Sequence, residues 1–390
     1  MRLRALTARW AGALGFLSLA VSAYSATRQA GLRPDEAVPL PAGFPVPSVP
    51  ADNLFSIEKA ELGRYLFYDT RLSATGTFAC ASCHQQALAF TDGQPTAIGA
   101  TGQRHRRNTM SLTNVVYNRT FNWAEARTHS LEEQALVPMF GLDPIEMGMT
   151  GAEEGILQTL AADSEYQQRF PLAFPAESAP ISIPNIVRAI ATFERSLISF
   201  GSAYDRYVTH GDAKALSPSA ERGLELFFSR GLGCSQCHSG LNLNGNTTWF
   251  ERETLPLEFH NTGLYNLGRG RYPKSDRGRF EETHRKRDTG RFRAPTLRNI
   301  ALTAPYMHDG SVPSLDSVLD HYSVGGRTVH TGPHRGIGRR NRYKSRLVKR
   351  LDFTTTQRAD LLAFFDCLTD QDFVTDPRLA NPRAPALPFG

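Results

Sequence analysis

The amino-acid sequence predicts a mostly α-helical protein built from two similar units with long irregular loops. The first observation is a repeat, because an amphipathic helix followed by C-x-x-C-H occurs once in each half of the chain. The second is the scarcity of strand signals, the short runs that alternate apolar and polar residues. The third is the frequency of turn-forming residues, with 32 glycines and 24 prolines among 390 residues.

Two matching helices are expected at residues 56–73 and 217–233, directly before the cysteine motifs. Each begins with a serine, a residue preferred at helix N-termini, and each has apolar side chains at helical spacing. Each also has two adjacent aromatic residues near its end. A further amphipathic helix, at 183–199 in the first half and 354–370 in the second, closes each unit. This self-similarity indicates an internal duplication.

These elements divide the chain into two domains with flanking segments. Residues 1–26 are predicted to be a signal peptide, and residues 27–54 a proline-rich extended segment. The first domain is expected at 55–205 and the second at 206–372, followed by an extended tail at 373–390. With 41% hydrophobic and 21% charged residues, the composition is that of a globular protein, and the length suffices for two packed cores.

The predicted signal peptide starts with basic residues and continues as an apolar run that is too short to cross a membrane. Small residues follow at the spacing of a cleavage site, so we expect export to the periplasm. An uncleaved N-terminal anchor is the alternative. No later segment approaches the roughly 20 apolar residues of a spanning helix, so no membrane span is expected in the mature chain.

Charge is divided unequally between the two halves. Residues 27–200 carry 13 basic and 18 acidic side chains, whereas residues 201–390 carry 28 basic and 20 acidic ones. Residues 327–350 contain nine lysines or arginines and no acidic residue. Such a run is typical of a solvated loop surface, and it can also attract an acidic protein partner. Nucleic acid is not expected as a partner, because the sequence has no recognition motif for it.

The cysteines give the first chemical signal. They are Cys80, Cys83, Cys234, Cys237 and Cys367. An exported protein often pairs cysteines as disulfides, and two C-x-x-C pairs also suit a zinc ion. Neither interpretation explains why His84 and His238 each follow the second cysteine of a pair. The last cysteine lies on the apolar face of the helix at 354–370, where we expect a buried small side chain.

C-x-x-C-H is the attachment signature of haem c. Its two thiols bond to the vinyl groups of one porphyrin, and the adjacent histidine becomes an axial ligand of the iron. We therefore expect two cytochrome c-like haem domains, with His84 and His238 as the proximal ligands. The sixth position of each iron then decides the function. An electron carrier needs two fully ligated irons, whereas a peroxide enzyme needs one open iron with an acid–base group beside it.

From Leu62 to about Thr369 the chain resembles the bacterial dihaem cytochrome c peroxidase family, and it is most similar to the MauG/MbnH-like branch. The resemblance rests on both haem motifs and on the stretches "FNWAEARTHSLEEQALVP", "PIEMG" and "FRAPTLRNIALTAPYMHDG". These stretches are long and specific, and together they cover most of the mature chain.

The resemblance implies an open first haem. In peroxidases of the family, a loop histidine can cap the first iron, and the matching residue here is Ala100, which cannot ligate. His105 is the competing ligand, although we expect it on a surface loop. The family places a glutamine and a glutamate above the open iron, matching Gln134 and Glu146, with Pro138 at the pocket wall. The spacing from glutamine to glutamate is two residues longer than in the peroxidases, which weakens the match of the glutamate.

The resemblance also implies how the haems communicate. Trp123 matches a tryptophan between them, whose indole can carry an oxidising equivalent, although plain core packing is the alternative. Tyr322 matches the position that ligates the second iron, where typical peroxidases have methionine and MauG-like enzymes have tyrosine. An anionic phenolate stabilises ferric and higher oxidation states, whereas a thioether raises the reduction potential. Met307 and His321 are the competing ligands.

A calcium ion between the domains is a further property that the resemblance implies. The family holds it through an asparagine side chain and backbone carbonyls, and the matching residues are Asn108, Thr303 and Pro305. Oxygen ligands suit this hard cation. The alternative for the asparagine is an ordinary hydrogen-bonded position in a turn.

The implied function is that of a dihaem enzyme with haem c and Ca²⁺ as cofactors. Hydrogen peroxide would form a high-valent dihaem state, which oxidises a tryptophan or tyrosine of a partner protein by long-range electron transfer. Two alternatives stay open: a peroxidase that takes electrons from a small redox protein, and a dihaem electron carrier without enzymatic activity.

Overall fold

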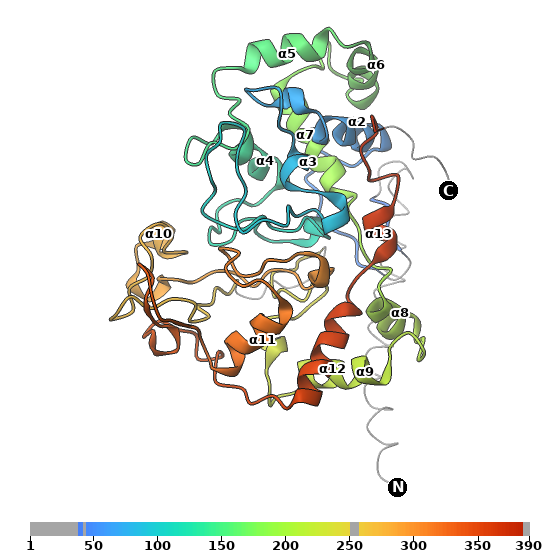
Figure 1. Cartoon of the computed structure of the whole chain (residues 1–390). Helices are drawn as coiled ribbons and strands as arrows, with labels where there is room; N and C mark the ends of the chain where they lie inside the picture. The colour runs from blue at the N-terminus through green and yellow to red at the C-terminus, as the bar shows by residue number, and fades with distance from the viewer. Residues whose placement is uncertain (1–37, 42–43, 250–256, 385–390) are drawn as a thin grey trace.

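The computed structural model describes residues 38–41, 44–249 and 257–384 (Figure 1). The predicted signal peptide and the start of the extended segment at 27–54 lie outside the described residues. The described part of that segment has no helix or strand, and Phe44 stacks on Phe200 with ring centroids 3.6 Å apart. Within the described ranges, no helix is long and apolar enough to cross a membrane.

The described chain is mostly helical with little sheet, as the sequence predicts. The helices of the first half are α2 (Ile57–Phe67), α3 (Cys80–Cys83), α4 (Leu131–Phe140), α5 (Glu153–Ala161), α6 (Ser164–Ala173) and α7 (Ile183–Arg195). Those of the second half are α8 (Ala203–His210), α9 (Pro218–Phe228), α10 (Phe280–Thr283), α11 (Leu315–Ser323), α12 (Thr355–Asp366) and α13 (Gln371–Thr375). The two short strands β1 (Thr328–Val329) and β2 (Gly336–Ile337) pair antiparallel.

The paired helices start where the sequence predicts. Ser56 caps α2 by accepting a hydrogen bond from the backbone of Lys59, and Ser217 caps α9 in the same way. Both helices end earlier than expected, at Phe67 and Phe228. Short polar side chains at each end bond to local backbone groups instead, and these bonds compete with continuation of the helix.

The two halves repeat one helix crossing. In the first half α2 packs on α7, and a Cβ atom added to Gly63 would lie 1.9 Å from the carbonyl oxygen of Ala189. In the second half α9 packs on α12, and a Cβ atom on Gly223 would lie 1.9 Å from the carbonyl oxygen of Asp360. Only glycine allows the helix backbones to approach so closely. This shared crossing supports the predicted duplication.

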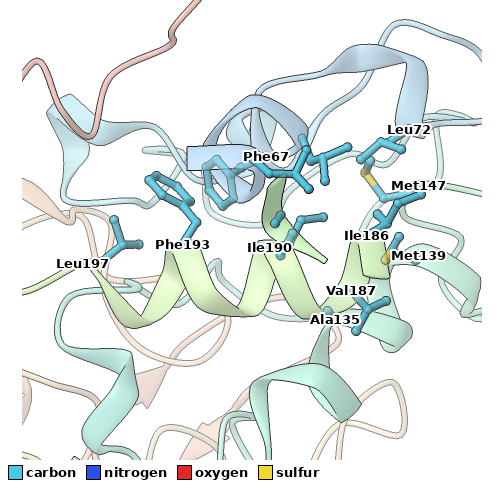
Figure 2. Close-up of a cluster of buried hydrophobic side chains, with 14 of the residues drawn as sticks. Phe67, Leu72, Ala135, Met139, Met147, Ile186, Val187, Ile190, Phe193 and Leu197 are labelled. Carbon is cyan, nitrogen blue, oxygen red and sulfur yellow. The ribbon is translucent and has the colours of Figure 1, made fainter. Parts of the chain in front are cut away.

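Each half has its own hydrophobic cluster. Figure 2 shows Phe67 of α2 directed toward Ile190 and Phe193 of α7 in the first cluster. The rings of Phe67 and Phe193 are 5.1 Å apart in an edge-on arrangement. The second cluster gathers side chains of α9, α11 and α12, together with Trp123 from the first half of the sequence. One aromatic residue therefore belongs to the core of the opposite half.

The C-terminal segment differs from the predicted extended tail. The helix α13 runs to Thr375 and leads back toward the first half (Figure 1). Phe373 and Val374 are buried in the first cluster. Tyr68 donates a hydrogen bond to the backbone of Leu379 at 2.8 Å. The end of the second half thus returns to the first half. Cys367 is half-buried at the end of α12 and not fully buried as expected.

Candidate functional site

The first C-x-x-C-H motif forms a single helical turn, α3. The backbone of His84 donates to the carbonyl of Cys80 at 3.0 Å, which holds the imidazole close to both thiols. Its Nδ1 lies 2.8 Å from the carbonyl oxygen of Phe90, so Nδ1 carries the proton and donates it. This bond fixes the ring orientation and leaves Nε2 unprotonated, with its lone pair available to a metal ion, as in metal-ligating histidines generally.

The second motif repeats this geometry. The backbone of His238 donates to the carbonyl of Cys234 at 3.0 Å, and its Nδ1 lies 2.9 Å from the carbonyl oxygen of Leu243. All five cysteines are free, and among the described residues no three His, Cys, Asp or Glu side chains gather as a metal site would require. The matching tautomers of His84 and His238 are a feature that neither the disulfide nor the zinc interpretation explains.

A cavity of about 950 Å³ opens in front of the first motif. Its volume lies in the usual range for cofactor sites. The cavity is lined by Cys80, Cys83, His84, Trp123, Gln134, Pro138, Glu146 and Arg293, among others. Two thiols and an imidazole with a free Nε2 in the wall of one large cavity are the donor set that haem c needs, so the residues fit this group.

The predicted acid–base residues line the same cavity. Gln134 and Pro138 project from α4, and Glu146 follows in the next loop. Burial raises the pKa of Glu146 to about 7, because a desolvated carboxylate is costly. A close loop contact holds this glutamate: the backbone of Ala100 donates to its carbonyl at 2.7 Å. The contact needs Gly99, where a Cβ atom would lie 2.1 Å from the carbonyl oxygen of Ile145.

His105 lies on a loop, as expected, but its side chain lines this cavity and is not at the outer surface. Its side chain is only 15% exposed, and Nδ1 lies 4.0 Å from a carboxylate oxygen of Glu146. Its Nε2 is buried without a hydrogen-bond partner among the described residues. A short bridge between Ile98 and Arg104 makes the segment extended, so alternate side chains point inward. The flanking arginines hid this alternation in the sequence. His105 therefore stays a competing ligand of the first iron.

Tyr322 belongs to α11. Burial, and then the thiols of Cys237 and Cys234, raise the pKa of its phenol, so the hydroxyl lies in the neighbourhood of the second motif. His321 instead directs Nε2 to the carbonyl of Thr262 at 3.0 Å, with Nδ1 buried and unpartnered among the described residues. Met307 is half-buried against the second cluster. These positions favour the tyrosine as a ligand, and the ligand itself stays a prediction.

Comparison with known proteins identifies the family of the chain. Residues 57–214 match the family model described as di-haem cytochrome c peroxidase. The chain is 32% identical to the methylamine utilization protein MauG of Methylorubrum extorquens, over 91% of this chain and 88% of that protein. The chain belongs to the di-haem cytochrome c peroxidase family. It is also 36% identical to the cytochrome c551 peroxidase of Pseudomonas aeruginosa, over 68% of this chain and 71% of that one.

A solved structure extends the match to the whole fold. The crystal structure of a MauG-like protein associated with microbial copper homeostasis aligns with a TM-score of 0.86 and 46% identity, covering 88% of this chain and 98% of that one. Residues 291–323 match a second model, described as RoxA-like and cytochrome c-like. This di-haem peroxidase family member is therefore an oxidoreductase, and its family implies haem c as cofactor.

Trp123 and Asn108, predicted as the electron relay and as a calcium ligand, both contact the second half of the chain. Trp123 is 8% exposed, lines the first cavity and packs in the second cluster. Its indole nitrogen donates to the carbonyl of Asn108 at 2.8 Å. The Asn108 backbone in turn donates to the carbonyl of His308 at 2.7 Å, which ties the loop to the second half.

The same asparagine is the predicted calcium ligand. Its amide nitrogen donates to the carbonyl of Gln94 at 2.8 Å, and among the described residues its Oδ1 accepts no hydrogen bond. Thr303 and Pro305 come a few residues before His308, whose carbonyl accepts a hydrogen bond from the Asn108 backbone. The hydroxyl of Thr303 donates to the carbonyl of Ile300 at 3.2 Å. An amide oxygen that accepts no hydrogen bond from the described residues is a possible ligand for a hard cation. The calcium site stays a prediction.

Sequence reasoning missed Glu194 of α7. Its side chain is 6% exposed and lines the first cavity, and Oε2 has no partner among the described residues. Burial raises its pKa to about 8. The sequence did contain a signal, because this glutamate follows Ile190 by four residues and precedes Leu197 by three on the apolar stripe of α7.

Proposed function

We propose that the protein carries a haem c at each C-x-x-C-H motif and uses hydrogen peroxide to oxidise a tryptophan or tyrosine of a partner protein. The observation behind this proposal is the asymmetry of the two motifs. An acid–base residue, Glu146, lines the cavity of the first motif, and a tyrosine, Tyr322, lies near the second motif. The 46% identity to a MauG-like protein and the 32% identity to MauG support the oxidation of a protein substrate.

Bound haem would supply an iron that reduces peroxide at the first motif and a store for oxidising equivalents at the second. Glu146 accepts a proton from the peroxide and returns it to the leaving oxygen, and a pKa of about 7 suits both transfers. The amide of Gln134 orients the peroxide. Pro138 has no N–H group, so it cannot donate a hydrogen bond to the backbone carbonyl of Gln134. Its ring narrows the cavity beside the side-chain amide of Gln134.

Trp123 is the proposed electron relay between the two halves. It is buried between the first cavity and the second cluster, and the hydrogen bond from its indole nitrogen to Asn108 fixes its ring. A fixed aromatic ring in this position shortens the path that an electron must cross. The predicted calcium ion near the asparagine would hold the two halves together, and export to the periplasm would supply the compartment in which haem c proteins are assembled.

Tyr322 is proposed as the sixth ligand of the second iron. Burial raises the pKa of this phenol and so favours its neutral form, and a bound metal cation would stabilise the phenolate instead. A hard anionic oxygen lowers the reduction potential of the iron. The second site would then hold an oxidising equivalent, and it would accept electrons poorly from a donor of high potential.

The basic second half is the proposed docking face for an acidic partner. A cavity of about 600 Å³ opens there. Its cationic lining residues are Arg279, Arg287, Arg291, Arg342, Lys344 and Arg346. Glu258 and Asp288 are the acidic residues in its wall, so the positive charges exceed the negative ones. This excess attracts acidic surfaces, and the attraction weakens as salt is added.

The proposal is tested by mixing ferric holoprotein with hydrogen peroxide and then adding either N-acetyltryptophanamide or a reduced small cytochrome c. We expect oxidation of the tryptophan derivative after the peroxide is consumed. We also expect Tyr322→Met to oxidise the cytochrome about tenfold faster than the wild type does, a change worth roughly 1.4 kcal/mol in barrier height. Mass spectrometry and stopped-flow absorbance measure the two reactions.

A cytochrome c peroxidase is the second candidate, and the 36% identity to the Pseudomonas aeruginosa enzyme favours it. It predicts rapid oxidation of the reduced cytochrome by the wild type, with no gain from Tyr322→Met. That result would contradict the proposal. An electron carrier predicts no reaction with peroxide, and the half-buried Glu146 in the wall of the first cavity, with its raised pKa, argues against it.

A further inference from the structure

Arg293 is a buried cation without a carboxylate partner. Its side chain lies in the wall of the first cavity and is 4% exposed. Its Nε donates to the carbonyl of Asn122 at 2.9 Å, and its Nη2 donates to the carbonyl of Phe121 at 3.1 Å and to the sulfur of Met110 at 3.3 Å. Neutral acceptors do not balance a full positive charge. Burial accordingly lowers the pKa of Arg293 to about 9.

Other arginines in the same cavity wall have acidic partners. Arg107 binds both carboxylate oxygens of Asp276, at 2.6 and 2.8 Å. Arg106 and Arg127 also form ion pairs with carboxylates. Among the described residues Arg293 forms no ion pair, and its side chain donates hydrogen bonds from Nε and Nη2 alone. Arg293 is therefore the exception in this wall.

A buried guanidinium is costly unless it is paired with an anion. Arg293 shares one cavity with the thiols and imidazole of the first haem motif, so the anion that the cavity is built to receive belongs to its occupant. A haem carries two propionate carboxylates, and a planar guanidinium recognises carboxylates through parallel hydrogen bonds.

We propose that Arg293 binds a propionate of the first haem. It would thereby connect that haem to the second half, because Arg293 belongs to the second half of the sequence. Its backbone N–H donates to the carbonyl of Trp123 at 2.9 Å, so the same residue also positions the proposed relay. The inference rests on haem at the first motif and is independent of the partner-protein reaction.

The test is resonance Raman spectroscopy of resting ferric holoprotein, without peroxide. We expect Arg293→Met to shift the propionate-bending band of one haem, because that band responds to hydrogen bonds at the carboxylate. We also expect the reduction equilibrium of that haem to move toward the ferric form by about tenfold, or ~59 mV for a one-electron couple, because a nearby positive charge favours electron uptake.

Arg107→Met is the matched control. It removes a guanidinium from the same cavity wall, but this guanidinium already pairs with the carboxylate of Asp276. We expect its propionate band to stay in place. If Arg293→Met does not fold, Arg293→Lys keeps the charge but loses the planar fork, and a shifted band with a nearly unchanged potential is expected. An unchanged band and potential in a folded Arg293 variant would overturn the proposal. Failure of the peroxide reaction would leave these resting-state spectra unaffected.

Discussion

The two halves of the molecule share a scaffold and differ in what faces their histidines. His84 and His238 have the same tautomer, fixed by carbonyl oxygens at 2.8 and 2.9 Å. Each half also has a helix crossing that only glycine permits. Beside the first motif lie the carboxyl groups of Glu146 and Glu194, whereas the phenol of Tyr322 lies near the second motif. The two halves therefore share the histidine hydrogen bonds and the helix crossing, and they differ in the side chains near each motif.

The shared crossing gives a residue-by-residue register between the halves. The glycine of α2 lies against Phe193, and the glycine of α9 lies against Phe364 in the same way. The next residues are Glu194 in the first half and Phe365 in the second, which are 6% and 7% exposed. The same buried position therefore holds a carboxyl group beside the open cavity and an aromatic ring in the other half.

The largest expected effect is on the reaction with peroxide at the first motif. Glu146→Gln removes the acid–base group and should lower the rate constant for the reaction with peroxide by about 10²- to 10⁴-fold, the usual contribution of such a group. Stopped-flow absorbance of the holoprotein measures it. The control is Glu133→Gln, an exposed carboxylate at the same cavity, which should react like the wild type. Equal rates for both variants would remove Glu146 from the mechanism.

The second effect concerns the carboxyl group that the second half lacks. The pKa of Glu194 is raised to about 8 from an ordinary value of 4.5, so folding favours its protonated form. This stability is complete below pH 4.5 and is lost as the pH rises toward 8. Glu194→Gln imitates the protonated group and should remove that loss, on the order of a few kcal/mol. Denaturant unfolding of holoprotein across this pH range measures it.

Glu154→Gln provides the control for this titration, because Glu154 is exposed on α5. Its unfolding free energy should follow the pH dependence of the wild type. If Glu194→Gln also follows the wild type, the buried carboxyl group is not the source of the pH dependence.

The third prediction tests whether the scaffolds are equivalent. Gly63→Ala and Gly223→Ala should each lower the free energy of unfolding by about 1–3 kcal/mol, because each added Cβ atom meets a backbone oxygen. Gly155→Ala is the control, since its Cβ atom would meet open space in α5, and it should stabilise the protein slightly. A harmless substitution at either crossing would show that the two crossings are not equivalent.

The smallest effect is the pH dependence of the open site. With a pKa of about 7, Glu146 accepts a proton only when ionised, so the peroxide rate constant should rise with pH and level off above 7. Below 7 it should fall by about tenfold per pH unit. The Glu146→Gln variant should lack this inflection, and a bend that persists in the variant would assign it to another group, such as His105.

Local signals in the sequence predicted where the helices begin. The positions of His105 and of the chain end depend on tertiary contacts, which local signals do not show. Serine caps and helical spacing act within a few residues, so the helix starts were predicted correctly. The inward position of His105 depends on a bridge with Ile98, and the buried end of α13 depends on packing against the first half. Family resemblance singled out Gln134 and Glu146, which line one cavity with His84, and sequence spacing alone would not have singled them out.

The central claim is that one iron is open and the other is closed by Tyr322. Electron paramagnetic resonance of frozen ferric holoprotein, compared with Tyr322→Phe, tests it most directly. The account predicts one high-spin and one low-spin signal in the wild type, and in the variant a change of the low-spin signal alone. Two low-spin signals in the wild type, or a low-spin signal that Tyr322→Phe leaves unchanged, would contradict it.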